Sequence, residues 1–243
     1  MRFKLSTELI EIFKKYKDGI YLETGFNEGR SAFEALTFGF KKVISIEINQ
    51  KLVESGKKKF RNFIENNRLE IVAGDSAKLL EEILAKNNDI KVIFLDAHGG
   101  IVPSENDHPL EQELNIVKKY FSRDKLIIID DYPGIKNYRT PIRGATIPNW
   151  VLKLKPETFI RKINEITDNY TELPYIYSYS KFYLNSHINS YLILGKISQY
   201  LIIKAKIKNF LFLIYYYPMQ FLKEFLRNNL NKRLYDNIKN LFN

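Results

Sequence analysis

Acidic side chains stand at the ends of successive apolar runs in this sequence. Each of five short apolar runs is followed, within three residues, by at least one carboxylate. Carboxylates can accept hydrogen bonds from hydroxyl groups, hold a divalent cation or move a proton. The role of these carboxylates depends on whether the ends of the apolar runs lie close together in the folded protein. The residues are Glu23, Glu47, Asp75, Asp96, Asp130 and Asp131.

The runs alternate with segments of helical period, which predicts a parallel sheet with helices on both faces. Runs such as LIII and KVIFL are β-branched and almost continuously apolar, which is typical of strands covered on both sides. The expected strands are Gly19–Leu22, Lys42–Ile46, Leu69–Val72, Lys91–Leu95 and Lys125–Ile129. The expected helices between them are Ser31–Phe38, Gln50–Asn67, Ala77–Asn87 and Pro109–Phe121.

Three further elements are expected after a long loop, Pro133–Trp150. They are a helix at Pro156–Asn169 and strands at Tyr175–Phe182 and Tyr191–Leu194, an antiparallel pair that closes the sheet. The fold class is therefore α/β, a doubly wound and mainly parallel sheet of about seven strands whose last strand is antiparallel. A helical extension follows it.

Ligands of open parallel sheets bind outside the carboxyl ends of the strands. After the first strand, Gly25 permits a tight turn, and the helix that opens at Gly29–Ser31 presents N–H groups to a carboxylate or phosphate. Asn27 occupies the middle glycine position of G-x-G-x-x-G, which disfavours a dinucleotide. Glu47 follows Gly29 by 18 residues, a spacing suited to ribose hydroxyls.

Three aspartates end the fourth and fifth strands, in FLDAHGG and IIIDDYPG. Converging carboxylates repel one another unless a cation lies between them, and oxygen ligands suit Mg²⁺, Ca²⁺ or Mn²⁺. The alternative to a metal site is that one of the three aspartates caps a helix, one pairs with a lysine and one is solvated. His98 is a candidate base or extra ligand, or simply a loop residue. His108 and His187 do not complete a zinc site with it, and the absence of cysteine excludes thiol chemistry.

These ordered motifs, over about Tyr16–Lys196, resemble those of the class I S-adenosylmethionine-dependent methyltransferases, whose catalytic domain is Rossmann-like. Glu23, Thr24, Gly25 and Gly29 match the first motif of that family. The resemblance implies that this loop flanks the methionine part of the cofactor, that Glu47 binds the ribose and that Asp75 and Ser76 lie near the adenine. The implied cofactor-binding residues are Glu23, Thr24, Gly25, Gly29, Ser31, Glu47, Asp75 and Ser76.

The aspartates also look like the metal site of cation-dependent O-methyltransferases. In catechol-type enzymes the second pair of metal ligands is usually Asp-Asn, so the Asp-Asp-Tyr run here is closer to the macrolide-sugar enzymes. The Leu-Asp-Ala-His segment is similar to that of methyltransferases from bacterial surface-glycan clusters. The resemblance implies that Asp96, Asp130 and Asp131 bind Mg²⁺. The predicted catalytic residues are Asp96 and, from the chemistry of its imidazole beside Asp96, His98. The resemblance further implies an SN2 transfer to a hydroxyl acidified by the metal.

The long loop carries Lys136, Arg139 and Arg143, which suit a phosphate or carboxylate on the substrate, or form a solvated basic loop. The expected acceptor is a small anionic or carbohydrate molecule: a sugar, a sugar phosphate or a nucleotide-linked intermediate of surface-glycan biosynthesis. The alternatives left open are an RNA methyltransferase, a metal-dependent phosphohydrolase or glycosyl-transfer enzyme using the same aspartates, and a non-catalytic membrane-recruited module.

The chain has 243 residues, 45% of them hydrophobic and 27% charged, which excludes a collagenous or disordered protein. We expect a catalytic domain over residues 1–197 and a basic tail over 198–243. The tail has eight Lys and Arg against Glu224 and Asp236, and so holds +6 of the net +10. The start MRFKLSTELIEIF lacks the apolar stretch of a signal peptide, which predicts a cytoplasmic protein.

The tail predicts an amphipathic helix. Phe210–Met219 is about half the length that spans a bilayer, and apolar residues then recur at helical spacing between Phe221 and Phe242. Packing on the catalytic domain or a homo-oligomer interface is favoured over contact with an anionic inner-membrane surface. The regular apolar stripe argues against nucleic acid as a partner.

Overall fold

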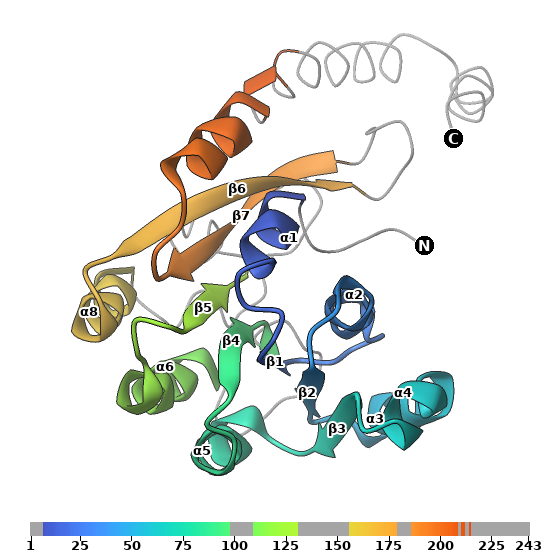
Figure 1. The fold of residues 1–243 in the computed structure, drawn as a ribbon. Helices are drawn as coiled ribbons and strands as arrows, with labels where there is room; N and C mark the ends of the chain where they lie inside the picture. The colour runs from blue at the N-terminus through green and yellow to red at the C-terminus, as the bar shows by residue number, and fades with distance from the viewer. Residues whose placement is uncertain are drawn as a thin grey trace, which may run out of the picture. The chain divides into compact units, whose positions relative to one another are not determined.

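The computed structural model describes residues 7–97, 109–130, 156–178, 186–208, 210, 211 and 214. Helices and strands alternate through most of this part (Figure 1). The elements up to the fifth strand are α1 (Thr7–Phe13), β1 (Ile20–Thr24), α2 (Arg30–Phe38), β2 (Lys42–Glu47), α3 (Gln50–Lys59), α4 (Arg61–Glu65), β3 (Leu69–Ala73), α5 (Ser76–Lys86), β4 (Ile90–Leu95), α6 (Pro109–Tyr120) and β5 (Leu126–Ile129). They are followed by α8 (Pro156–Ile166), β6 (Tyr170–Ser178) and β7 (Ser186–Leu194).

Seven strands form one sheet in the order β3-β2-β1-β4-β5-β7-β6. Strands β1 to β5 pair in parallel, whereas β7 runs antiparallel to β5, with Ile193 opposite Ile128. This confirms the predicted doubly wound, mainly parallel fold. The strand order reverses direction between β1 and β4, and ligands of such sheets bind beside this point.

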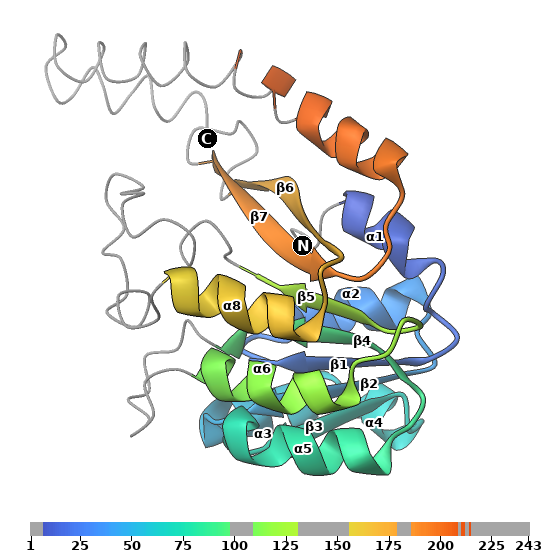
Figure 2. The ribbon, with the colours of Figure 1, turned by 90° about the vertical axis from the view of Figure 1, so that its left-hand side faces the viewer.

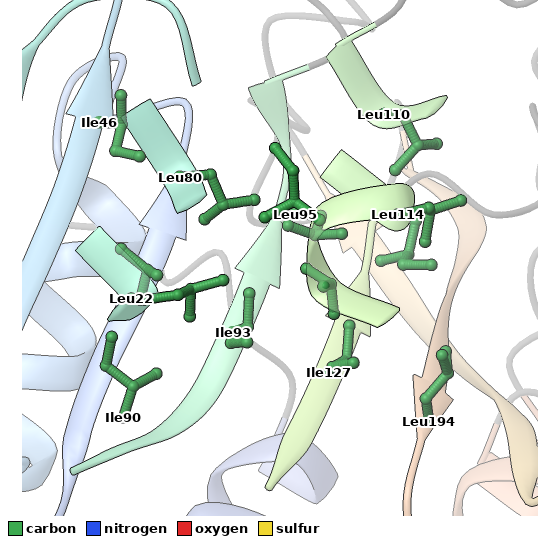
Figure 3. Packing of buried hydrophobic residues seen from close by; sticks show 14 of the residues in the cluster. Leu22, Ile46, Leu80, Ile90, Ile93, Leu95, Leu110, Leu114, Ile127 and Leu194 are labelled. Atoms are coloured by element: carbon green, nitrogen blue, oxygen red, sulfur yellow. The ribbon is translucent and has the colours of Figure 1, made fainter. Parts of the chain in front are cut away.

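Helices cover both sides of the sheet. α5, α6 and α8 lie on one side, and α1, α2, α3 and α4 lie on the other (Figures 1 and 2). The first side is aliphatic, because Leu22 and Ile93 of the sheet pack with Leu80 of α5 and Leu114 of α6 (Figure 3). Removing this surface from water is the main favourable term in folding.

The opposite side of the sheet is aromatic. The ring of Phe13 in α1 meets that of Tyr21 in β1 edge-on at a centroid distance of 5.7 Å, and meets that of Phe40 at 5.2 Å. Edge-on pairs of this kind contribute beyond their buried area. Helix α1 is therefore part of the core, although sequence periodicity did not predict it.

Three elements differ clearly from the prediction, and one of them, strand β7, begins at Ser186 rather than Tyr191. The expected helix Gln50–Asn67 is two helices, α3 and α4, which meet at Phe60. The ring of Phe60 packs edge-on against that of Phe26 at 5.8 Å, a tertiary contact that the helical period does not encode. Strand β6 begins at Tyr170 rather than Tyr175 and contains Pro174. Proline is tolerated there because β6 is the edge strand, where no ladder donor is needed on the outer side.

The chain divides into two compact units, residues 1–172 with 190–197, and residues 173–189 with 198–243. The first unit contains the ends of the five parallel strands. The division into a catalytic domain 1–197 and a tail 198–243 stays a prediction. In the part of the chain that the structure describes, no helix combines the length and the apolar character needed to cross a membrane.

Candidate cofactor and metal site

The register of the sheet brings the predicted residues to one edge. Thr24 of β1 lies opposite Ile46 of β2 and Leu95 of β4. Ile46 in turn lies opposite Val72 of β3, and Leu95 opposite Ile129 of β5, so these residues form one row across the five strands. The next position on each strand therefore forms a second row at the carboxyl edge. From β3 to β5 this row is Ala73, Glu47, Gly25, Asp96 and Asp130.

Gly25 brings the loop after β1 against the end of β4. Its φ of +83° lies in the left-handed region, and a Cβ there would be 2.6 Å from the carbonyl oxygen of Asp96. Its N–H donates to the carbonyl of Ile46 at 2.9 Å. Only glycine adopts this φ without strain and leaves room for the Asp96 carbonyl, so this position requires glycine.

Asn27 takes the left-handed conformation in the same loop, with φ of +49°. Asparagine is among the few residues other than glycine that adopt this conformation readily. The departure from the common glycine at this position therefore leaves the turn intact. Sequence reasoning missed the role of Asn27, and the signal available was this tolerance of asparagine.

The carboxylate of Glu47 is held by two backbone N–H groups. Asn27 donates to its Oε2 and Asn49 donates to its Oε1, each at 2.8 Å. The side chain is 7% exposed, so both oxygens have fixed positions. Each carboxylate oxygen can accept a further hydrogen bond, and Glu47 can therefore receive the hydroxyls of a ligand. Asn49, which also caps α3 through its side chain, was not predicted to contribute.

Other predicted residues join strands below this edge. Glu23 is fully buried, and its Oε1 accepts a hydrogen bond from the Ser45 hydroxyl at 2.8 Å, directly across β1 and β2. Thr24 is also buried, and its Oγ1 accepts the N–H of Asp96 at 3.2 Å. These contacts support positioning roles, because they link β1 to the strand on either side of it.

Helix α2 begins at Arg30, after its N-cap Gly29, which has φ of +72°. Glycine has no side chain, so no side-chain oxygen caps the first turn. The first N–H groups of a helix have no acceptor within the helix, and they carry partial positive charge. Ser31 in this first turn is buried. The end of α2 can therefore receive a carboxylate.

Asp75 is the N-cap of α5. Its Oδ1 accepts the N–H of Ala77 at 3.0 Å, and its Oδ2 lies 3.9 Å from the Lys78 ammonium. The preceding Gly74 donates its N–H to the carbonyl of Glu47 at 2.9 Å. Asp75 and the buried Ser76 therefore follow a residue that is bonded to the end of β2. Their contact with adenine stays a prediction.

Asp96 and Asp130 are neighbours on the second row. The Asp130 N–H donates to the carbonyl of Leu95 at 3.1 Å, which extends the β4–β5 pairing by one residue. Asp130 is 1% exposed and Asp96 is half-buried. Among the described residues no three carboxylate or histidine side chains lie close enough to hold a metal. The Mg²⁺ site stays a prediction, since the remaining predicted residues fall outside the described part: His98, Asp131, Lys136, Arg139 and Arg143.

A buried phenol lies below the same edge. Burial raises the pKa of Tyr21 well above its ordinary value, and the negative charges of Glu23 and Asp96 raise it further. Its hydroxyl has no hydrogen-bond partner within the described ranges. Tyr21 is therefore neutral at physiological pH.

Comparison with known proteins identifies the fold. No protein-family model matches the sequence, and a search of curated proteins finds no relative. Solved structures do match. An O-methyltransferase from Bacillus cereus in complex with SAH is 16% identical, with a TM-score of 0.52, and the match covers 81% of this chain and 84% of that one. The O-methyltransferase TomG from Streptomyces achromogenes, involved in tomaymycin synthesis and solved with SAM, is 12% identical, with a TM-score of 0.52 and coverage of 80% and 82%.

The chain has the fold of these methyltransferases. Precorrin 8w decarboxylase from Methanobacterium thermoautotrophicum shares it as well, at 14% identity and a TM-score of 0.51, over 81% of this chain and 93% of that one. The same fold thus supports more than one kind of reaction, so a function must be argued from the residues of the site.

Proposed function

We propose that the protein is an S-adenosylmethionine-dependent methyltransferase. The observation that carries this proposal is the arrangement of Glu47, whose carboxylate is fixed by two backbone N–H groups. Glu47 follows Ile46, the partner of Thr24, and so lies beside Gly25, which is in the loop that leads to the start of α2. The cofactor has a ribose diol, which needs an acceptor, and an amino-acid carboxylate, which needs donors. Glu47 and the first turn of α2 offer these two groups at the same edge of the sheet.

The chain's own residues would bind and orient the cofactor. The fixed carboxylate of Glu47 accepts the ribose hydroxyls without first having to be ordered, which is the benefit of a preorganised site. The first N–H groups of α2 hold the carboxylate of the methionine part. Gly25 lets the loop backbone lie against Asp96, so the cofactor loop and the end of β4 form one rigid wall.

We further propose that Asp96 and Asp130, together with Asp131, hold Mg²⁺ and that the reaction is an O-methylation. Oxygen ligands at adjacent strand ends suit this cation, which when bound would lower the pKa of an acceptor hydroxyl. Asp96 is half-buried and orients the acceptor, whereas Asp130 lies deeper and sets the position of the pair. His98 is proposed as the proton acceptor or an extra ligand.

The proposed acceptor is a small anionic or carbohydrate molecule. The support comes from the basic residues that follow the aspartates in the sequence, Lys136, Arg139 and Arg143, since guanidinium groups pair well with phosphates and carboxylates. A sugar phosphate or a nucleotide-linked sugar has both the hydroxyl and the negative charge that this set requires.

Calorimetric titration of the full chain with S-adenosylhomocysteine tests the proposal. We expect micromolar binding with Mg²⁺ present, and binding that persists in EDTA, because Glu47 and α2 do not depend on the metal. Failure to bind under both conditions would contradict the proposal. Hydrolysis of phosphate esters without any methyl donor would instead favour a metal-dependent phosphohydrolase.

A further inference from the structure

A helix that follows the sheet has two apolar faces. It includes residues 199–208, 210, 211 and 214, coloured orange to red after β7 in Figures 1 and 2. One face is buried, with Leu201, Ile202 and Ala205 at 9% exposure or less. The other face consists of large apolar side chains between 50% and 67% exposed. They are Tyr200, Ile203, Ile207, Phe210, Leu211 and Ile214.

The exposed residues form one continuous stripe. At about 100° per residue, they fall within an arc of about 100°, and the three buried residues lie on the opposite side of the helix. Six of the seven large hydrophobic side chains that are exposed in the described part of the chain belong to this stripe. Single exposed hydrophobic residues are ordinary, whereas a contiguous set marks an interaction surface.

Lysines line the stripe on both sides. On the same helical geometry Lys204 and Lys208 lie along one edge, and Lys206 lies along the other. The sequence between Lys196 and Gln220 contains no aspartate or glutamate. The stripe is therefore apolar along its middle and bordered by lysines on both sides.

We propose that this stripe binds an anionic lipid surface, with the helix lying parallel to the membrane plane. The apolar side chains would enter the acyl boundary, while the lysines meet the lipid phosphates, as interfacial amphipathic helices do. Packing of the stripe on a second copy of the chain would place lysine edges against lysine edges. An anionic lipid surface instead offers negative charge on both sides of the inserted stripe.

Sequence patterning favoured packing or self-association for this tail. That preference rested on apolar residues at helical spacing between Phe221 and Phe242, which lie outside the described residues. In the described helix the side-chain exposures separate a buried and an exposed apolar face, and the proposal concerns only the exposed one.

Co-sedimentation of the full chain with vesicles tests the proposal. We expect at least tenfold stronger binding to phosphatidylcholine vesicles containing 30% phosphatidylglycerol than to pure phosphatidylcholine. The double substitution Ile203→Gln and Ile207→Gln should reduce binding to the anionic vesicles at least tenfold, and Lys206→Glu should also weaken it. The matched control, Ile203→Leu with Ile207→Leu, retains the apolar stripe and should bind as the unmodified chain does.

Three results would overturn the proposal. They are absence of binding to anionic vesicles, equal binding by the glutamine and leucine pairs, and a dimer in analytical ultracentrifugation that the glutamine pair abolishes. The last result would assign the stripe to a second copy. Far-UV circular dichroism of each variant provides the folding check. Because it does not depend on S-adenosylhomocysteine binding, failure of this proposal is distinguishable from failure of the proposed activity.

Discussion

The backbone N–H of Asn27 donates a hydrogen bond of 2.8 Å to Oε2 of Glu47, across 20 residues of sequence. The bond joins the loop after β1 to the end of β2, at a residue whose φ of +49° lies in the left-handed region. Hydrogen bonds to ionised acceptors are stronger than neutral ones. The contact therefore fixes both the loop and the carboxylate that we propose to bind the cofactor.

Removing the charge of Glu47 should weaken cofactor binding. In Glu47→Gln an NH₂ group replaces one carboxylate oxygen. This NH₂ group is a donor, so it cannot accept the backbone N–H that the oxygen accepted. We expect the Kd for S-adenosylhomocysteine to rise at least tenfold, since hydrogen bonds to charged groups contribute about 1.5–3 kcal/mol. Calorimetry measures this change.

Glu70→Gln is the matched control for that substitution. Glu70 lies on the neighbouring strand β3, where its exposed carboxylate pairs with the Lys42 ammonium at 2.5 Å. We expect its Kd to match that of the unmodified chain. Equal Kd values for the Glu47 and Glu70 variants would exclude the proposed ribose contact.

Adding a methyl group at Gly25 should disrupt the site by collision. Gly25→Ala would bring a Cβ to 2.6 Å from the carbonyl oxygen of Asp96, in addition to the strain of a left-handed alanine. Gly39→Ala meets no atom within 4 Å and has only the strain of its φ of +111°, about 1–2 kcal/mol. Urea unfolding should show a larger loss of stability for the Gly25 variant.

Cofactor binding adds a second measurement to this pair. Gly25→Ala should lose affinity for S-adenosylhomocysteine, and Gly39→Ala should keep it. Similar affinity and stability for the two variants would mean that the approach of the loop to Asp96 has no importance for the site.

Tyr21→Phe should stabilise the protein, increasingly so at alkaline pH. The folded pKa of Tyr21 is raised by burial and by Glu23 and Asp96, whereas tyrosine in the unfolded chain ionises near pH 10. The stability that depends on Tyr21 is therefore fully present below pH 10 and is lost as pH rises beyond it. Phenylalanine removes that loss, so the stability difference should grow by up to about 1.4 kcal/mol per pH unit above 10.

Urea unfolding at pH 7, 10 and 11 measures this difference. At pH 7 we expect the variant to be more stable by up to about 1 kcal/mol, because the buried hydroxyl has no hydrogen-bond partner among the described residues. Tyr200→Phe makes the same chemical change at a side chain that is 67% exposed, and it is the matched control for the loss of a hydroxyl. A difference for Tyr21→Phe that does not grow above pH 10 would contradict the prediction.

Substitution of Asp130 should impair metal binding. Electron paramagnetic resonance with Mn²⁺ as the probe measures this directly, and we expect Asp130→Asn to raise the Kd for Mn²⁺ at least tenfold. Asp124→Asn is the control, because Asp124 is exposed and pairs with Lys91. Equal Mn²⁺ binding by both variants would remove the aspartates at the strand ends from the proposed metal site.

The sequence predicted the sheet and the edge at which its acidic residues meet. Nearly continuous apolar runs such as LIII specify buried strands, and parallel strands separated by helices must end at the same edge. The positions of Glu47, Asp96 and Asp130 on one row followed from that rule. The fold class and the order of motifs are thus properties of local patterning.

Tertiary structure alone decided how individual side chains are used. Glu23 and Glu47 both follow strands, yet Glu23 is buried against Ser45 while Glu47 is held by the N–H groups of two loops. The break between α3 and α4 at Phe60 and the left-handed turn at Asn27 depend on partners distant in sequence. The apolar period predicted for the tail lies between Phe221 and Phe242, outside the described residues, and the sequence did not predict that Ile203 and Ile207 are exposed. Periodicity records which residues are apolar, whereas the surface that covers them, and the contacts that fix a backbone dihedral, exist only once distant segments have packed together.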